Sequence, residues 1–115
     1  MRRGAIVLVD LDPALTGEAN KRRPAVIVSN DRANATAQQL GRGVVTVVPL
    51  TSNVSHVYPF QVILPAEDTG LHRDSRAQAE QVRAVSVRRV GPTIGVVPPD
   101  LMRHLDGALR LHLDL

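Results

Sequence analysis

Short apolar runs separated by turn residues are the dominant pattern along the chain. The first run, at residues 5–9, stops at the sequence DLDP and predicts a buried strand followed by a turn. Residues 13–23 mix Gly, Thr, Asn and charged side chains without periodicity, which is typical of a long, mobile loop. A second strand is expected at residues 24–28, where Pro24 suits only the first position or a sheet edge.

A short helix and two further strands are expected in the middle of the chain. The sequence SNDRANATAQQL predicts a helix that begins at a cap formed by Asn30 or Asp31. A third strand is expected at residues 43–48. Alternation in VYPFQVILPA predicts a fourth strand, which Pro59 assigns to an edge of the sheet. One side of this strand would carry Phe60, Val62 and Leu64.

The last third of the chain predicts more strands and then a helix. A loop, EDTGLHRDS, leads to AQAEQVRAVSV, whose alternation predicts one continuous fifth strand with Gln78 and Glu80 on its polar face. A short last strand is expected in VGPTIGVV. The two prolines of VVPPDLM suit the start of a helix. One face of that helix would carry Leu101, Leu105, Ala108, Leu109 and His112.

Together these elements predict one domain over residues 1–115, of the mainly β (α+β) class. The expected architecture is a small antiparallel barrel or sandwich, with a short helix after the second strand and a C-terminal helix packed on it. A chain of 115 residues buries one core and leaves no room for a second domain.

Arginine dominates the charge of this chain. The net charge is +3, and thirteen of the fourteen cations are arginines, which stay protonated at any ordinary pH. Because a guanidinium group binds two phosphate oxygens at once, we expect nucleic acid or an acidic protein segment rather than a small neutral ligand. Tyr58 and Phe60 are the only aromatic residues, so hydrogen bonds and charge must carry most of the affinity for a single strand.

Two absences narrow the expected location and chemistry. The chain has no cysteine, which excludes disulfides, thiol catalysis and cysteine-type zinc sites. The opening, MRRGAIVLVDLDP, has five apolar residues before Asp10, too few for the core of a signal peptide, and no later run approaches the length of a membrane span. We therefore expect a cytoplasmic protein with no membrane partner.

Five blocks of residues carry a resemblance to a known family. They are RRG…VDLDP, GE…KRRPAVIVSND, VVPLTSN, YPFQVIL and AEQVR, in this order over most of the chain. With them the chain resembles the MazF/PemK toxin family. The resemblance implies an SH3-like barrel and a metal-independent endoribonuclease that cleaves single-stranded RNA at short sequences without a cofactor. It also implies a homodimer, and a cognate antitoxin with an acidic C-terminal segment that silences the enzyme.

The resemblance also assigns roles to individual residues. The arginine of the R-P pair is Arg23, the threonine at the strand end is Thr51, and the loop glutamate is Glu18; an acid-plus-glutamine pair falls on Glu80 and Gln81. We expect Arg23, Thr51 and Glu18 to be catalytic. RNA contacts are expected from Asn20, Lys21, Arg22, Ser52, Asn53, Gln78, Glu80 and Gln81.

The chemistry needs these residue types. Attack by a ribose 2′-OH on the adjacent phosphorus requires a proton acceptor and stabilisation of the charge on the phosphoryl oxygens. Arg23 suits the second task, and Thr51 can position the phosphate or the 2′-OH through one hydrogen bond. Glu18 is a possible base, and His56 is an alternative acid or base.

Other readings of the same residues remain open at this point. HRD at residues 72–74 is interpreted as a loop tripeptide, and His104 and His112 as surface or partly buried helix residues. A gyrase-binding toxin of the same fold and a non-catalytic SH3-like binding module are the alternative functions. The recognised RNA sequence, the target RNA and the antitoxin are not predicted.

Overall fold

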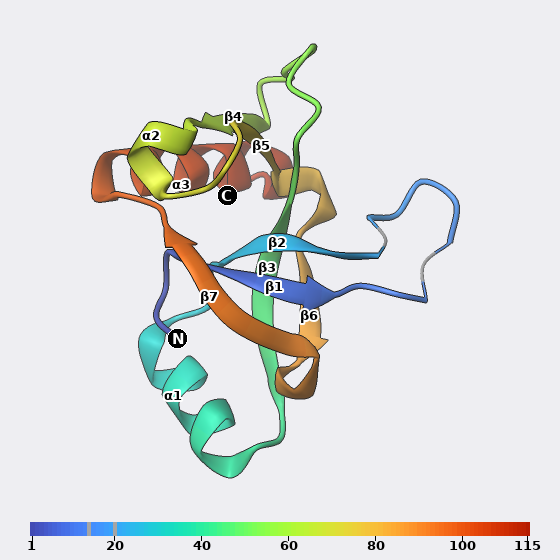
Figure 1. The fold of residues 1–115 in the computed structure, drawn as a ribbon, viewed down its shortest axis with the longest axis vertical. Helices are drawn as coiled ribbons and strands as arrows, with labels where there is room; N and C mark the ends of the chain where they lie inside the picture. The colour runs from blue at the N-terminus through green and yellow to red at the C-terminus, as the bar shows by residue number, and fades with distance from the viewer. Residues whose placement is uncertain (14, 20) are drawn as a thin grey trace.

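An antiparallel sheet forms the centre of the fold. The structure is a computed structural model that describes residues 1–13, 15–19 and 21–115, so the predicted RNA contact Asn20 lies outside the described residues. Within the described part, seven strands form one sheet in the order β4-β5-β3-β2-β1-β7, and β6 also pairs with β3 (Figure 1). The strands are β1 (Ala5–Asp10), β2 (Arg22–Ile27), β3 (Val44–Thr51), β4 (Gln61–Leu64), β5 (Ser75–Gln78), β6 (Arg83–Ser86) and β7 (Val90–Val96).

Helices lie at both ends of the sheet. α1 (Asp31–Leu40) is at one end, and α2 (Ala66–Thr69) and α3 (Pro99–Leu113) are at the other. Of the two possible caps, Asn30 begins α1, because its side chain accepts the backbone N–H of Ala33 at 2.8 Å. The predicted proline start of α3 is confirmed as well. The short helix α2 replaces part of the predicted loop and ends at Gly70, whose φ of 82° suits glycine.

β1 is buried on both faces, which explains why its sequence is a continuous apolar run. Ala5, Val7 and Val9 join one core cluster, which also contains Ala37 of α1. Ile6, on the opposite face, joins a second cluster with residues of β2, β3 and α3. From Ala5 to Val9 every residue is buried or half-buried, so this run needs no polar residue at alternate positions.

The predicted fifth strand is wrong in one respect: the chain forms two strands there. A single 3₁₀ turn, η1 (Ala79–Gln81), separates β5 from β6. Both strands pair with the same edge of β3, at Leu50↔Ala77 and Val47↔Arg83. From Ala77 to Arg83 the chain advances by six residues, whereas β3 advances by only three between their partners, Leu50 and Val47. The turn η1 accommodates the three additional residues. Glu80 and Gln81 consequently lie on a turn, not on a strand.

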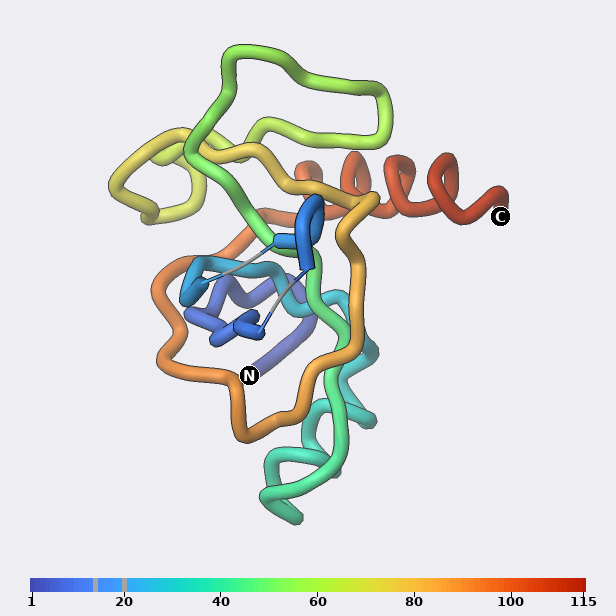
Figure 2. The backbone as a smooth tube through the Cα atoms, turned by 90° about the vertical axis from the view of Figure 1, so that its right-hand side faces the viewer, coloured from blue at the N-terminus to red at the C-terminus, as the bar shows by residue number. Residues whose placement is uncertain are grey.

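The mainly β, α+β class is confirmed, although the sheet stays open. β4 and β7 are the two ends of the strand order, so the edge position expected from Pro59 just before β4 is right. Pro24 lies third in β2, where β2 pairs with β1 but not yet with β3, whose pairing begins at Ala25. Figure 2 shows the last turns of α3 running out beyond the strands.

Candidate functional site

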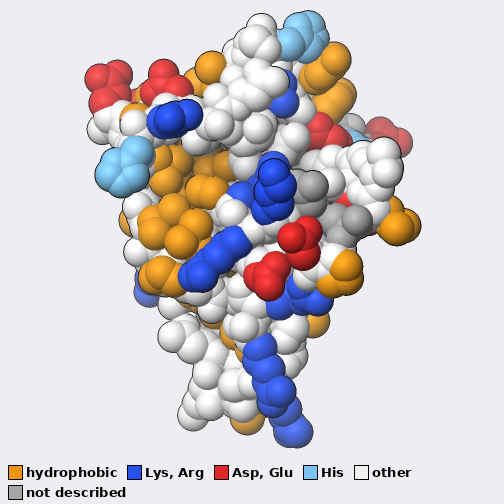
Figure 3. Space-filling model, turned by 45° about the vertical axis from the view of Figure 1, so that its right-hand side comes forward, with side chains coloured by type: hydrophobic (Ala, Val, Ile, Leu, Met, Phe, Trp, Pro, Cys, Tyr) orange, Lys and Arg blue, Asp and Glu red, His pale blue; other side chains and the backbone are white. Residues whose placement is uncertain are grey.

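A pocket of about 380 Å³ lies where β2 begins and β3 ends. Four segments form its walls: the start of β2, the end of β3, the connection from α2 to β5, and β7. Its lining residues are Lys21, Arg22, Arg23, Pro24, Leu50, Thr51, Ser52, Leu71, His72, Arg73, Ser75 and Ile94. Figure 3 shows cationic side chains beside an apolar area on one face of the molecule. The pocket lining thus combines cationic and hydroxylic side chains with apolar ones.

Strand register brings Arg23 and Thr51 together. Ala25 of β2 is opposite Pro49 of β3 in an antiparallel pair. Two residues further along each strand, Arg23 and Thr51 continue the same row on the same face, because side chains alternate with a period of two. Both residues are half-buried. Although they are 28 positions apart in the sequence, both residues line the pocket.

The end of β3 is held by its own loop. Thr51 Oγ1 accepts the backbone N–H of Asn53 at 3.3 Å, so the threonine keeps its O–H to donate. Asn53 Oδ1 accepts from the backbone N–H and the hydroxyl of Ser55, at 3.1 and 2.7 Å. Asn53 therefore shapes the loop and is not among the residues that line the pocket, whereas Ser52 lines it.

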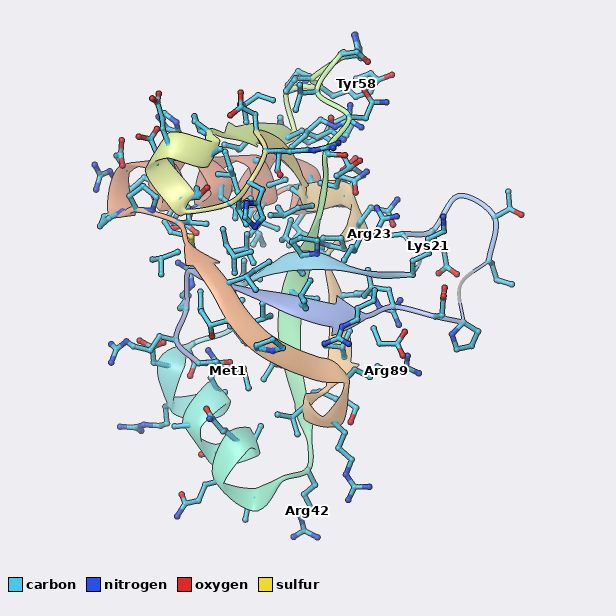
Figure 4. The ribbon with its side chains drawn as sticks, viewed as in Figure 1. Met1, Lys21, Arg23, Arg42, Tyr58 and Arg89 are labelled. Carbon is cyan, nitrogen blue, oxygen red and sulfur yellow. The ribbon has the colours of Figure 1, made fainter. Side chains whose placement is uncertain are left out.

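The loop that precedes the cationic sequence KRR is closed at its base by two hydrogen bonds. The backbone N–H of Lys21 donates to Asp12 Oδ1 at 2.9 Å, and Leu11 N–H donates to the Lys21 carbonyl at 3.0 Å. These bonds hold Lys21 at a φ of 65°, where a side chain other than glycine needs outside support. Figure 4 shows Lys21 and Arg23 at the same end of β2, with Arg42 at the far end of the molecule.

Three predicted site residues lie in a different hollow. Glu18, Glu80 and Gln81 line a space of about 470 Å³ that also includes Arg83. Glu18 Oε1 accepts the backbone N–H of Leu15 at 2.7 Å, so this carboxylate closes its own loop. The carboxylate of Glu80 accepts from Gln61 Nε2 at 3.0 and 2.5 Å. The described chain does not bring Glu18 into the pocket of Arg23 and Thr51.

With this geometry in hand, comparison with known proteins identifies the family. The family model described as "PemK-like, MazF-like toxin of type II toxin-antitoxin system" matches residues 2–113. The chain belongs to this family. Over 115 residues, all of this chain and 98% of the relative, it is 62% identical to Endoribonuclease MazF9 of Mycobacterium tuberculosis. It is 33% identical over 114 residues, 98% of this chain and 96% of the relative, to Endoribonuclease MazF6 of the same species.

Solved structures of MazF proteins share the fold of this MazF-like chain. MazF from Deinococcus radiodurans superposes with a TM-score of 0.82 at 26% identity, covering 100% of this chain and 97% of that one. A MazE–MazF structure from the same species gives a TM-score of 0.74 at 26% identity, with 100% and 96% covered. The resemblance seen in the five sequence blocks is therefore confirmed.

Gln78 and His56 lie outside both hollows of the MazF-like domain. Gln78 is half-buried on β5, and its Oε1 is buried without a hydrogen-bond partner among the described residues. His56 lies on the loop after β3, where its ring meets that of Tyr58 edge-on at 4.3 Å between centroids. Neither residue is among those that line the pocket of Arg23 and Thr51 or the hollow of Glu18.

Sequence reasoning missed two residues of the pocket, His72 and Arg73. Both are exposed and lie on the connection that enters β5. The interpretation of HRD as a loop tripeptide agrees with the backbone, but it did not place His72 and Arg73 in the pocket. The pairing of Arg76 with Thr51 places the residues just before β5 beside the end of β3, and no periodic signal in the sequence indicates this pairing.

Metal and membrane features are not found in the described chain. Among residues 1–13, 15–19 and 21–115, no group of three or more His, Asp or Glu side chains is arranged to hold a metal ion. In the same residues, no helix has the length and apolar character needed to cross a membrane.

Proposed function

We propose that this MazF-like toxin is a sequence-specific, metal-independent endoribonuclease that cleaves single-stranded RNA in the pocket of Arg23 and Thr51. The endoribonuclease class rests on family membership and on a full-length relative of that name at 62% identity. The observation that carries the finer proposal is the convergence of Arg23 and Thr51, with three further cations, in one pocket.

The charges of the pocket favour a phosphodiester. Its charged lining residues are Lys21, Arg22, Arg23 and Arg73, and no carboxylate is among the described residues that line it. The planar guanidinium of Arg23 matches two phosphoryl oxygens and stabilises the charge that grows on them during attack. Removing one such donor typically costs about 2.7–4 kcal/mol of transition-state stabilisation.

The nucleophile in the proposed reaction is the ribose 2′-OH. Its oxygen attacks the adjacent phosphorus, and the bond to the 5′-oxygen breaks, which leaves a 2′,3′-cyclic phosphate and a 5′-OH. Thr51 donates its O–H to a phosphoryl oxygen and so orients the scissile phosphate. DNA lacks the 2′-OH, so the proposed mechanism is limited to RNA.

Sequence preference is assigned to the surfaces around the pocket. Glu18 and Glu80 present carboxylates in the neighbouring hollow, where they can accept from exocyclic amino groups of bases. The loop after β3 adds Ser52 and Asn53, and the predicted contact Asn20 stays part of the proposal as a sequence-based assignment. The roles of Gln78 and Gln81 in reading bases have less support, because Gln78 lines neither hollow and both polar groups of the Gln81 amide bind the loop.

A homodimer and an antitoxin complete the proposal. Leu105 of α3 is buried, whereas Leu111 and Leu113 are 58% and 50% exposed, so the leucines of this helix face both the core and the proposed dimer surface. A cationic pocket that binds RNA phosphates also attracts the acidic C-terminal segment of a cognate antitoxin, which would then block RNA by occupying the same surface. Action on cellular RNA would place the toxin in the cytoplasm.

The proposal is tested by measuring the growth of cells that express the wild type or Arg23→Ala, with Arg42→Ala as the matched control. Arg42→Ala removes the same charge at an exposed position far from the pocket. We expect induction of the wild type and of Arg42→Ala to arrest growth and fragment cellular RNA. Arg23→Ala should do neither at equal expression. Arrest by the wild type with intact RNA would refute the nuclease proposal and favour a toxin that acts by binding a protein such as gyrase.

A further inference from the structure

The pocket of Arg23 and Thr51 contains one side chain suited to proton transfer near neutral pH. Of the described residues that line the pocket, His72 alone has an imidazole, and the others are cationic, hydroxylic or apolar. Arginine does not act as a base in proteins, and a threonine or serine hydroxyl does not accept a proton at neutral pH. Histidine is the residue type that changes charge in this range.

The fold holds the segment of His72 at both ends. On one side, Leu71 N–H donates to Thr69 Oγ1 at 3.4 Å, just after α2 ends. On the other side, Asp74 Oδ1 accepts the backbone N–H of Ala66 at 2.9 Å, and Ser75 enters β5 opposite Leu64. The backbone around His72 is therefore fixed, while its side chain is exposed. Such a side chain is available to a bound substrate.

The alternative bases are engaged elsewhere. The Glu18 carboxylate accepts a hydrogen bond from Leu15 in the neighbouring hollow. The ring of His56 contacts Tyr58 on the loop after β3 and is not part of the pocket lining. His72 is thus the histidine that shares a pocket with Arg23.

We propose that His72 is the general base of the RNA cleavage reaction, an inference that rests on the function proposed above. The neutral imidazole accepts the proton of the 2′-OH as the bond from O2′ to phosphorus forms. The bond from phosphorus to O5′ breaks, and the departing oxygen takes a proton from water. The hydroxide left by that water removes the proton from the imidazolium, so the enzyme returns to its starting state.

The charged groups around His72 define the pH experiment. From β2 the pocket receives Arg22 and Arg23, from the residue before β2 it receives Lys21, and from the segment of His72 itself it receives Arg73; the residues from β3 and β7 are uncharged. Arginine and lysine keep their charge between about pH 5 and 8. A change of rate in that range therefore reports on the histidine or on the RNA.

The test compares His72→Gln and His72→Ala with the wild type on a short single-stranded RNA that the wild type cleaves. Both variants should lose at least about a hundredfold in kcat/KM, which is the lower range for removal of a general base. The rate of the wild type should rise with pH through the range in which histidine loses its proton, and His72→Gln should lose that rise. Added imidazole should restore part of the activity of His72→Ala. His104→Gln, an exposed substitution on α3, serves as the control and should match the wild type.

Each other outcome has a distinct meaning. Wild-type rates in both His72 variants would overturn the inference and leave the proposed nuclease function intact. Loss of activity without rescue by imidazole and with an unchanged pH profile would assign His72 to binding and overturn its role as a base. A substrate with a 5′-bridging sulfur needs no acid for its leaving group; if it removes the defect of His72→Gln, the residue is an acid and not the base. Failure of the wild type to cleave any RNA would refute the proposed function itself, and this inference with it.

Discussion

Substitution of Gln81 tests whether its side chain anchors the loop between β1 and β2. Its side-chain amide makes two hydrogen bonds to the loop between β1 and β2. Gln81 Nε2 donates to the carbonyl of Gly17 at 3.0 Å, and Gln81 Oε1 accepts the backbone N–H of Ala19 at 3.0 Å. Ala19 is only 7% exposed, so its N–H has little access to water when the glutamine is removed.

The expected cost of Gln81→Ala follows from these two contacts. A neutral hydrogen bond contributes about 1 kcal/mol net, and a buried donor left without a partner costs about 1–3 kcal/mol. We therefore expect Gln81→Ala to lower the free energy of unfolding by about 2–4 kcal/mol. Gln81→Glu keeps an acceptor for Ala19 N–H but turns the donor that faced Gly17 into an acceptor, so it should also destabilise the protein.

Urea unfolding followed by circular dichroism, at one fixed protein concentration, measures this cost. With a urea dependence of about 1–3 kcal/mol per molar for a small protein, the midpoint should fall by at least about 0.7 M. Gln78→Ala is the matched control, because Gln78 Oε1 is buried without a partner among the described residues. Its truncation should cost clearly less. Equal stability of Gln81→Ala and the wild type would refute the role of Gln81 as a loop anchor and return it to the base-reading residues.

Three further predictions concern the pocket and the core. Arg73→Ala should weaken RNA binding and reduce the slope of log K against log salt by about 0.7, the value for one phosphate contact on a single strand, in fluorescence-anisotropy titrations; an unchanged slope would exclude a phosphate contact. Leu105→Ala should lower the free energy of unfolding by about 2–5 kcal/mol, since this residue is fully buried where α3 meets the sheet. Gly95→Ala should cost about 1–3 kcal/mol in the same assay, because its Cβ would lie 2.6 Å from the carbonyl oxygen of Thr69; a stability equal to the wild type would show that β7 and α2 move apart freely.

Local signals predicted the elements that local interactions form. The run of β1, the Asn30 cap of α1 and the proline start of α3 all depend on residues close in the sequence, and all three are confirmed. The division between β5 and β6 depends instead on pairing with β3. The alternation of AQAEQVRAVSV does change phase at two consecutive polar residues, Glu80 and Gln81, which lie in η1, but this local sign does not show that both halves pair with β3.

The candidate site also contains residues that the sequence predicts and residues that it does not. The convergence of Arg23 and Thr51 follows from one antiparallel register between two predicted strands, and a family resemblance had already singled out both residues. The position of Glu18 depends on how a long loop closes, which periodicity does not describe. His72 has no periodic signal either, because it lies on an irregular connection whose place is set by the sheet that follows it.

The most direct test of the account is the mapping of RNA ends after cleavage in EDTA. A long single-stranded RNA is incubated with the purified wild type, with Arg23→Ala and with Arg42→Ala, and the ends are identified by primer extension and by their chemistry. The account predicts discrete cuts by the wild type and by Arg42→Ala, with 5′-OH and 2′,3′-cyclic phosphate ends, and RNA left intact by Arg23→Ala. Cleavage that requires a divalent metal, or equal cleavage by Arg23→Ala, would contradict it.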